Sequence, residues 1–302
     1  MASAHVNGID IEYDTHGDPT AETILLVMGL GGQLVAWPID FVERLVAAGF
    51  HVVRFDNRDI GLSSKIDAPV PTRRELVLGV LSRRFATSTY LLSDMADDAV
   101  GLLDHLSIDR AHVVGASMGG MISQTIAIRH PQRVLSLTSI MSNTGDRKHG
   151  AISMSLLRKM PKLMTGAADD AVENGVRMFR LISGPRFDEA KAREFVAAAV
   201  ARSYCPEGAA RQTMAIMASP DRTEALASVT APTLVVHGLA DRLVRPSGGV
   251  TTAKAIPGSR LVMYPDMGHD LPEHRWDEMI GEIVANARRA RADVAATHPS
   301  AP

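Results

Sequence analysis

The sequence contains a single cysteine, Cys205, in 302 residues. One thiol cannot form an intramolecular disulfide, and it cannot build a structural zinc site alone, because such sites need four ligands. The fold must therefore be held together by its core. A chain of this length can bury a large core, either as one α/β domain with an insertion or as two domains.

An excess of charge of one sign is also missing. Lys and Arg number 32 and Asp and Glu number 34, which leaves a formal net charge of −2, and basic residues gather only in short pairs such as Arg73-Arg74 and Arg83-Arg84. Nucleic-acid binding usually needs a basic patch. We therefore expect no nucleic-acid partner.

Long hydrophobic runs are absent as well. No stretch of about 18 apolar residues occurs, and the opening segment MASAHVNGID does not combine a basic region with an apolar one as a signal peptide does. The composition, 46% hydrophobic and 22% charged, is that of an ordinary soluble globular protein. We expect no integral membrane segment and a cytoplasmic location, and the sequence leaves open whether a homodimer forms.

The first half of the sequence shows a pattern typical of parallel sheets. Asn7-Gly8 predicts a hairpin turn, and the apolar segment Ile24–Met28 predicts a buried strand. A segment with helical spacing follows Pro38 and stops near Gly49, and His51–Asp56 predicts the next strand. Together these elements form a β-α-β unit with short connections.

The same alternation continues after a polar, proline-containing stretch at residues 57–71. A helical pattern spans about 90–105, and the strand AHVVGAS leads into a helix at about 118–130. The helix stops before Pro131, and the strand VLSLTSIM follows at 134–141.

Strand signals then disappear between about residues 144 and 228, where several amphipathic helical stretches occur instead. They return with a strand at 232–238, a helical stretch near 248–256, the strand RLVMYP and a final helix at about 276–291. We predict a mostly parallel twisted sheet flanked by helices, with residues 1–143 and 229–302 as the core and 144–228 as an inserted helical cap.

The pentapeptide Gly115-Ala116-Ser117-Met118-Gly119 matches G-x-S-x-G between a predicted strand and a predicted helix. In this context the motif forms a strained turn that exposes the serine hydroxyl, and the flanking glycines avoid crowding. A plain glycine- and serine-containing turn is the simpler alternative. Ser117 is the candidate nucleophile.

A serine hydroxyl needs a base, and the base needs a carboxylate that fixes its tautomer. Asp241 follows the strand TLVVHG and His269 follows the strand LVMYP, so both lie at carboxyl ends of parallel strands, as Ser117 does. The order Ser, Asp, His also suits this motif. Asp266 and Asp270, next to the histidine in the chain, are poorly placed to reach its Nδ1–H, and Asp146 is the reserve acid.

Acyl transfer also requires two backbone N–H groups for the developing oxyanion. Met118, which follows the nucleophile, is one candidate, and Leu30 in the glycine-rich segment MGLGG is the other. Glycine-rich loops also cradle phosphates, but no Lys-Ser/Thr follows here and no G-x-G-x-x-G opens a helix. We therefore expect neither a cofactor nor a metal site.

With these residues in place, the chain resembles the α/β-hydrolase superfamily from about Val6 to Arg289. The segments LLVMGLGG, VVRFDNRDIGLS, AHVVGASMGG and PTLVVHG are similar to those of aclacinomycin methylesterases and related bacterial esterases and lipases. The resemblance implies hydrolysis of a carboxylic ester through an acyl-enzyme on Ser117. Many relatives have His-Gly at the oxyanion loop, where this chain has Met28-Gly29.

The substrate is less defined by the sequence than the chemistry. Trp37 and Met28 are candidate pocket residues, although packing against the sheet would use them equally well, and an apolar small-molecule ester is the expected substrate. The same machinery also suits thioesterases, phospholipases, lactonases, C–C hydrolases and cofactor-free haloperoxidases. A non-catalytic binding protein on this fold usually lacks a triad member, and here all three candidates are present.

Overall fold

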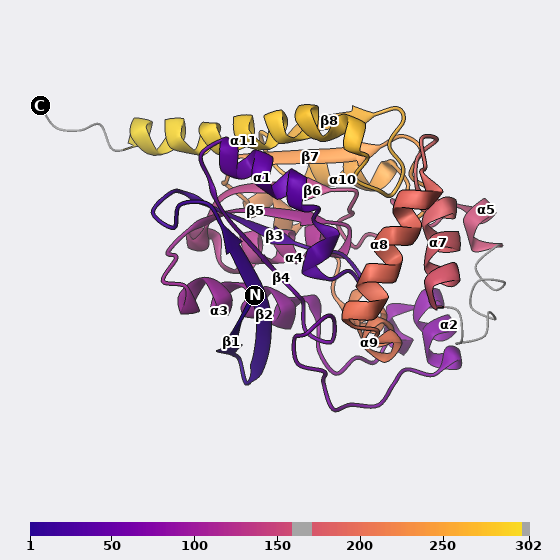
Figure 1. Cartoon of the computed structure of the whole chain (residues 1–302). Helices are drawn as coiled ribbons and strands as arrows, with labels where there is room; N and C mark the ends of the chain where they lie inside the picture. The colour runs from indigo at the N-terminus through magenta and orange to yellow at the C-terminus, as the bar shows by residue number, and fades with distance from the viewer. Residues whose placement is uncertain (159–170, 298–302) are drawn as a thin grey trace, which may run out of the picture.

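The computed structural model describes residues 1–158 and 171–297. In this part of the chain, eight strands form one sheet in the order β1-β2-β4-β3-β5-β6-β7-β8 (Figure 1). The strands are β1 Ala2–Val6, β2 Ile9–His16, β3 Thr23–Val27, β4 His51–Phe55, β5 Ala111–Ala116, β6 Val134–Ile140, β7 Thr233–Gly238 and β8 Arg260–Tyr264. Neighbouring strands from β4 to β8 are parallel, whereas β2 runs antiparallel to β1 and β4.

The helices are α1 Ile39–Ala47, α2 Arg73–Leu81, α3 Leu92–His105, α4 Met118–Arg129, α5 Met154–Leu157, α7 Ala171–Ile182, α8 Glu189–Arg202, α9 Pro206–Ala218, α10 Ser247–Ala255 and α11 Trp276–Thr297. None of those whose residues are described is long and apolar enough to cross a membrane.

Alternating residues of the central strands supply two hydrophobic clusters. Leu25 and Val27 of β3 pack with side chains of α3 and α4, whereas Ile24 and Leu26 pack with α1 and α11 on the other face. A strand buried on both faces needs a continuous apolar run, which explains the segment ILLV. In Figure 1, α1 and α11 accordingly cover one side of the sheet and α3 the other.

The sequence predicted most of these elements. The two-residue turn at Asn7-Gly8 is confirmed by the pairing of Val6 with Ile9, and the six predicted parallel strands each lie within one or two residues of the observed bounds. Helix α2 was missed. Its start carries a capping box, in which the Thr72 side chain accepts from the Glu75 N–H and the Glu75 carboxylate accepts from the Thr72 N–H.

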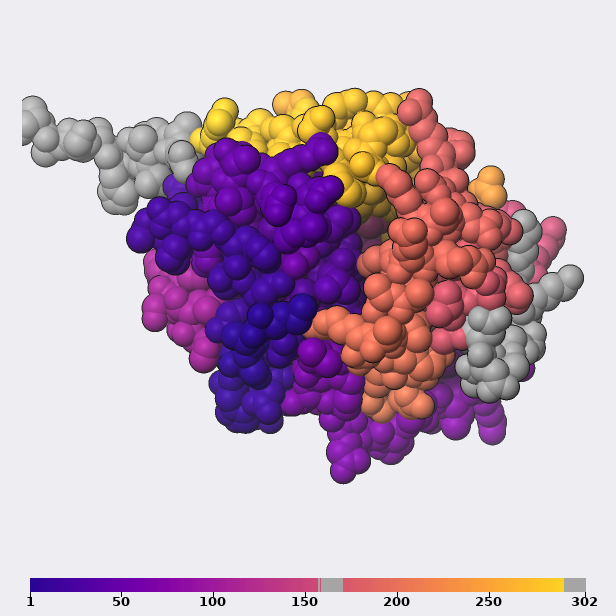
Figure 2. Space-filling model, viewed as in Figure 1, coloured from indigo at the N-terminus to yellow at the C-terminus, as the bar shows by residue number. Residues whose placement is uncertain are grey.

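Helices α5, α7, α8 and α9 lie between β6 and β7 in the chain, and we call residues 141–232 the β6–β7 insertion. Figure 1 shows these helices beside one end of the sheet, and Figure 2 shows the side chains of α8 and α9 packed against the N-terminal half of the chain. The helical stretches expected between about residues 144 and 228 are therefore present in the described part of this segment, while residues 159–170 lie outside it.

Buried ion pairs join the loop at residues 56–64 to its surroundings. Arg202 of α8 donates to Asp56 at 2.7 Å, and Arg211 of α9 donates to Asp59 at 2.7 Å. In the same loop, Arg58 makes two hydrogen bonds of 2.6 Å to Asp98 of α3. A buried charge is costly unless it is paired, so these contacts specify how the insertion and α3 sit on the loop.

We expect Asp98→Ala to lower the free energy of unfolding by about 3–5 kcal/mol, because it leaves the buried Arg58 guanidinium without its anion. Urea unfolding at equilibrium measures the change. Asp104→Ala on the same helix is the matched control, since Asp104 is 63% exposed where it meets Arg133 and its removal should cost at most about 1 kcal/mol. Equal losses for the two variants would contradict the importance of the buried pair.

Candidate active site

Ser117 lies at the turn between β5 and α4 in a backbone conformation that serine seldom adopts, with φ 56° and ψ −119°. Such a conformation costs about 1–3 kcal/mol and persists only where the surroundings enforce it. The glycines on both sides are part of that enforcement. A Cβ on Gly115 would lie 2.1 Å from the Gly119 carbonyl oxygen, and a Cβ on Gly119 would lie 2.0 Å from that of Val27.

The structure brings together the three side chains predicted to form a triad. His269 Nε2 lies 2.9 Å from Ser117 Oγ, and His269 Nδ1 lies 2.8 Å from Asp241 Oδ2. His269 and Asp241 are buried, with exposed fractions of 8% and 3%. Ser117 follows β5, Asp241 follows β7 and His269 follows β8 in the chain. The three residues therefore lie at the carboxyl ends of parallel strands, on the same side of the sheet.

Asp241 accepts three hydrogen bonds of 2.8–2.9 Å. The N–H groups of Leu243 and Val244 donate to Oδ1, both at 2.9 Å, while His269 reaches Oδ2. Burial opposes ionisation of this carboxyl, but the charge of His269 and hydrogen bonds from His237 and His269 outweigh it and keep the pKa of Asp241 below its ordinary value. The group is therefore suited to remain an anion beside the imidazole.

His237 is a neighbour of the site that the sequence analysis did not single out. Its Nε2 lies 2.8 Å from the Val244 carbonyl oxygen and 3.5 Å from Asp241 Oδ2, and the side chain is fully buried. Since the carbonyl oxygen can only accept, Nε2 carries the proton. Its position at the end of β7, four residues before Asp241, is the sequence signal that could have identified it as a neighbour of the site.

The competing carboxylates have other partners. Asp146 accepts from the Lys148 N–H and pairs with His149, and these interactions lower its pKa. Asp266 is bound by Arg275 and His274. Asp270 accepts from two backbone N–H groups, those of Gly268 and Gly184. The contact to His269 Nδ1 is thus made by Asp241.

The predicted oxyanion loop passes directly beside the nucleophile. A Cβ on Gly29 would lie 3.0 Å from Ser117 Cβ and 3.5 Å from its Oγ. The next glycine, Gly31, has φ +67° and donates its N–H to Gln212 Oε1 of α9 at 2.9 Å. Between them, Leu30 is 43% exposed.

Met118, the other predicted donor, is the first residue of α4. The first N–H groups of a helix have no acceptor within the helix, so this N–H is available where it faces the site. The donor roles of Leu30 and Met118 stay predictions.

Trp37 and Met28, the two predicted pocket residues, are both buried. Trp37 is inaccessible to solvent and packs against Phe41 with 5.7 Å between ring centroids, and Met28 is 7% exposed. Both belong to the cluster that α1 and α11 form on the sheet. Their contact with a substrate stays a prediction.

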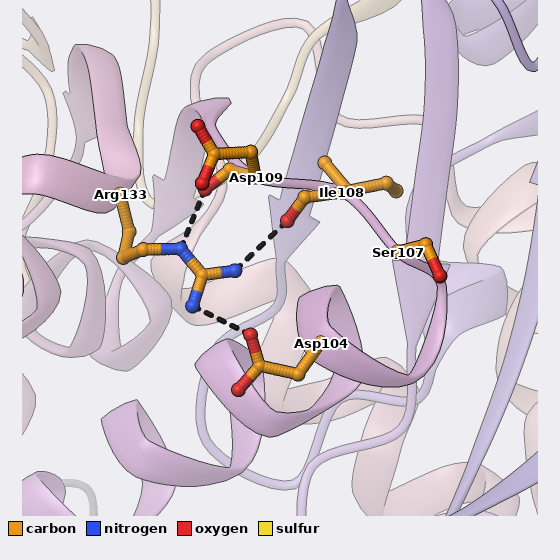
Figure 3. Close-up of a pocket in the computed structure, with 5 residues that line it drawn as sticks. All are labelled: Asp104, Ser107, Ile108, Asp109 and Arg133. Atoms are coloured by element: carbon orange, nitrogen blue, oxygen red, sulfur yellow. Dashed lines mark hydrogen bonds and ion pairs between the residues drawn. The ribbon is translucent and has the colours of Figure 1, made fainter.

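A surface cavity of about 280 Å³ lies away from these residues, lined by Asp104, Ser107, Ile108, Asp109 and Arg133 (Figure 3). It precedes β5 and β6 in the chain and so lies at the amino ends of those strands, opposite Ser117. The Arg133 guanidinium already donates to Asp104 and to the carbonyl oxygens of Ile108 and Asp109. The cavity is therefore no part of the candidate site.

Comparisons with known proteins agree with this architecture. The family model described as alpha/beta hydrolase fold matches residues 22–274. Rhodomycin D methylesterase DnrP of Streptomyces peucetius is 31% identical over 297 residues, and DauP of Streptomyces sp. (strain C5) is 30% identical; each match covers 91% of this chain and 93% of the relative. The structure of an enol-lactonase from Burkholderia xenovorans LB400 superposes with a TM-score of 0.72 at 23% identity, covering 94% of this chain and 99% of that one.

We expect Gly119→Ala to lower the free energy of unfolding by about 1–3 kcal/mol or more, because the new methyl group cannot fit against the Val27 carbonyl. Chemical denaturation measures the loss. Gly281→Ala in α11 is the control, since nothing lies within 4 Å of its Cβ position and alanine should stabilise the helix by about 0.5–1 kcal/mol. A neutral Gly119→Ala would show that the turn is not tightly packed.

Proposed function

The chain belongs to the alpha/beta hydrolase family, and from that membership we propose that the protein is a serine hydrolase of carboxylic esters. One observation carries the proposal. Ser117 Oγ, His269 and Asp241 form a continuous chain of contacts, 2.9 Å and 2.8 Å long, at the carboxyl edge of the sheet. This is the arrangement that makes a serine hydroxyl nucleophilic.

In the proposed reaction, His269 Nε2 takes the Ser117 proton as Oγ attacks the ester carbonyl. The N–H groups of Leu30 and Met118 stabilise the negative oxygen, and losing one such donor costs about 3–4 kcal/mol in the barrier. Protonated His269 then gives its proton to the departing alcohol, which leaves an acyl group on Ser117. His269 next activates a water molecule that hydrolyses the acyl-enzyme and regenerates the serine.

Asp241 supports each proton transfer without taking the proton itself. Its anion holds Nδ1–H of His269, so that Nε2 faces Ser117, and stabilises the imidazolium that forms. The two backbone N–H groups on Oδ1 fix the direction of the carboxylate, and the lowered pKa keeps it charged.

The proposed substrate is a small, apolar carboxylic ester. Two relatives at 30% and 31% identity are named methylesterases, which favours an ester among the bonds that this machinery can cleave. The side chains beside the turn, such as Met28 and Met118, are apolar. Dehalogenases and epoxide hydrolases that resemble this fold have an aspartate at the position that Ser117 occupies here, so the serine favours an esterase over these two classes.

A series of p-nitrophenyl esters from acetate to palmitate tests the proposal. We expect hydrolysis with an optimum chain length in the wild type and loss of turnover to background in Ser117→Ala, because no other nucleophile lies at the turn. A fluorophosphonate probe should label the wild type and leave Ser117→Ala unlabelled. Labelling without release from any ester would redirect the assignment to thioesters, lactones or C–C substrates, and absence of labelling would argue for a non-catalytic protein.

We expect Asp241→Asn to lower kcat by about three to four orders of magnitude while the protein stays folded, because an amide favours the wrong His269 tautomer. The pH profile provides a second check. The lowered pKa of Asp241 means that its charge is already present at pH 5, so titration of this carboxylate should not change the activity between pH 5 and 8. Near wild-type turnover in Asp241→Asn would contradict the proposed role of Asp241 as the acid of the triad.

A further inference from the structure

The β6–β7 insertion touches the loop that carries His269, which is the segment 265–270 between β8 and α11. The main-chain N–H of His269 donates to the carbonyl oxygen of Ile182, the last residue of α7, at 2.7 Å. In Figure 1 the upper ends of α7 and α8 accordingly lie next to this loop. The backbone of the predicted base is therefore bonded directly to the insertion.

Two glycines let these segments meet without side chains between them. A Cβ on Gly184 would lie 2.3 Å from the Asp266 carbonyl oxygen, and a Cβ on Gly268 would lie 2.4 Å from the Gly184 nitrogen. Neither distance is compatible with any side chain larger than hydrogen. Gly268 immediately precedes His269, so a displacement of the insertion at this contact moves the base.

The Asp270 carboxylate closes the contact. Its Oδ1 accepts from the Gly268 N–H at 2.9 Å and its Oδ2 accepts from the Gly184 N–H at 3.2 Å, so one side chain bridges the insertion and the histidine loop. Burial raises its pKa, and the two N–H donors and the charge of His269 act in the opposite direction, while Asp241 adds to the rise. His269 and Asp241 are the titratable groups facing it.

We propose that Asp270 is a positioning residue for the proposed hydrolysis: by joining Gly184 to Gly268 it lets the β6–β7 insertion hold His269 within reach of Ser117. The inference rests on the proposed function. Asp270 lies outside the triad and acts through the loop backbone. Its consequence is that the insertion cannot lift from the sheet at this edge without moving the base, so access for a substrate must open elsewhere.

Asp270→Asn tests the bridge at constant side-chain volume. An amide has one acceptor oxygen, so one of the two backbone N–H groups loses its partner and faces an NH₂ group instead. We expect kcat on the best p-nitrophenyl ester to fall about 10- to 100-fold with KM changed less than about 3-fold, because the base is displaced while substrate binding is retained. The pH dependence of kcat/KM should also change, because the buried Asp270 carboxyl, whose pKa is raised, is replaced by an amide that does not titrate.

Glu273→Gln is the matched control. Glu273 pairs with Lys191 at 2.5 Å, which also links the insertion to the segment after His269, but through exposed side chains. Kinetics and pH profile should equal those of the wild type. Gly184→Ala is the second variant, since its methyl group separates the same two surfaces while Asp270 stays intact. It should reproduce the fall in kcat.

The rate of fluorophosphonate labelling, normalised to folded protein by the melting transition, separates the possible results. Slower labelling in Asp270→Asn and Gly184→Ala, with Glu273→Gln unchanged, supports the inference even if no ester is cleaved, a result that would defeat only the proposed substrate. Wild-type kcat, labelling and pH profile in Asp270→Asn would overturn it. So would a loss that merely matches the fraction unfolded, because the bridge would then be structural alone.

Discussion

The close approach of helix α4 to the ends of β3 and β5 is the constraint on which the rest of the site depends. Gly115 and Gly119 leave no room for a Cβ, so the helix begins directly against the strand ends and Ser117 is held at φ 56°. The same approach brings Gly29, at the end of β3, into contact with the serine. One packing arrangement thus places the nucleophile beside both of the segments proposed to stabilise the oxyanion.

The insertion between β6 and β7 contacts both the predicted oxyanion loop and the His269 loop. On one side, Gln212 accepts from Gly31 of the predicted oxyanion loop and donates to the Arg58 carbonyl oxygen. On the other, Ile182 and Gly184 bind the His269 loop. Buried ion pairs of the arginines in α8 and α9 with the loop at 56–64 complete the attachment. Since these contacts are mostly polar and buried, each is sensitive to direction and distance, which suits the proposed role of the insertion in holding the candidate catalytic groups in position.

Patterns that are local in the sequence could be predicted, and contacts that depend on the insertion could not. The buried strands are recognisable in the sequence as apolar runs. The carboxyl ends of parallel strands lie on the same side of a sheet, and this rule was enough to group Ser117, Asp241 and His269. The proposed role of Asp270 was missed because the sequence suggested it only as a possible acid for His269. Its partner Gly184 follows α7, and the strand pattern does not predict where that helix lies relative to the sheet. His237 escaped notice because its burial beside Asp241 is set by how α10 packs on β7, where Gly249 lies against the imidazole. The capping box of α2 is readable in the sequence, but the apolar periodicity of the helix is weak, so the helix was not predicted.

The order of the three candidate residues along the chain has a consequence during synthesis on the ribosome. His269 comes 152 residues after Ser117, and Asp241 and His269 both follow the insertion. Domains fold as the ribosome releases them from the N-terminus, at about 5–20 residues per second. Ser117 therefore emerges before its proposed base, and a nascent or prematurely terminated chain lacking β8 does not contain His269. Under the proposed function, the serine thus stays without this base until β8 and the loop after it have been made, so protein synthesis sets the time at which the site becomes complete.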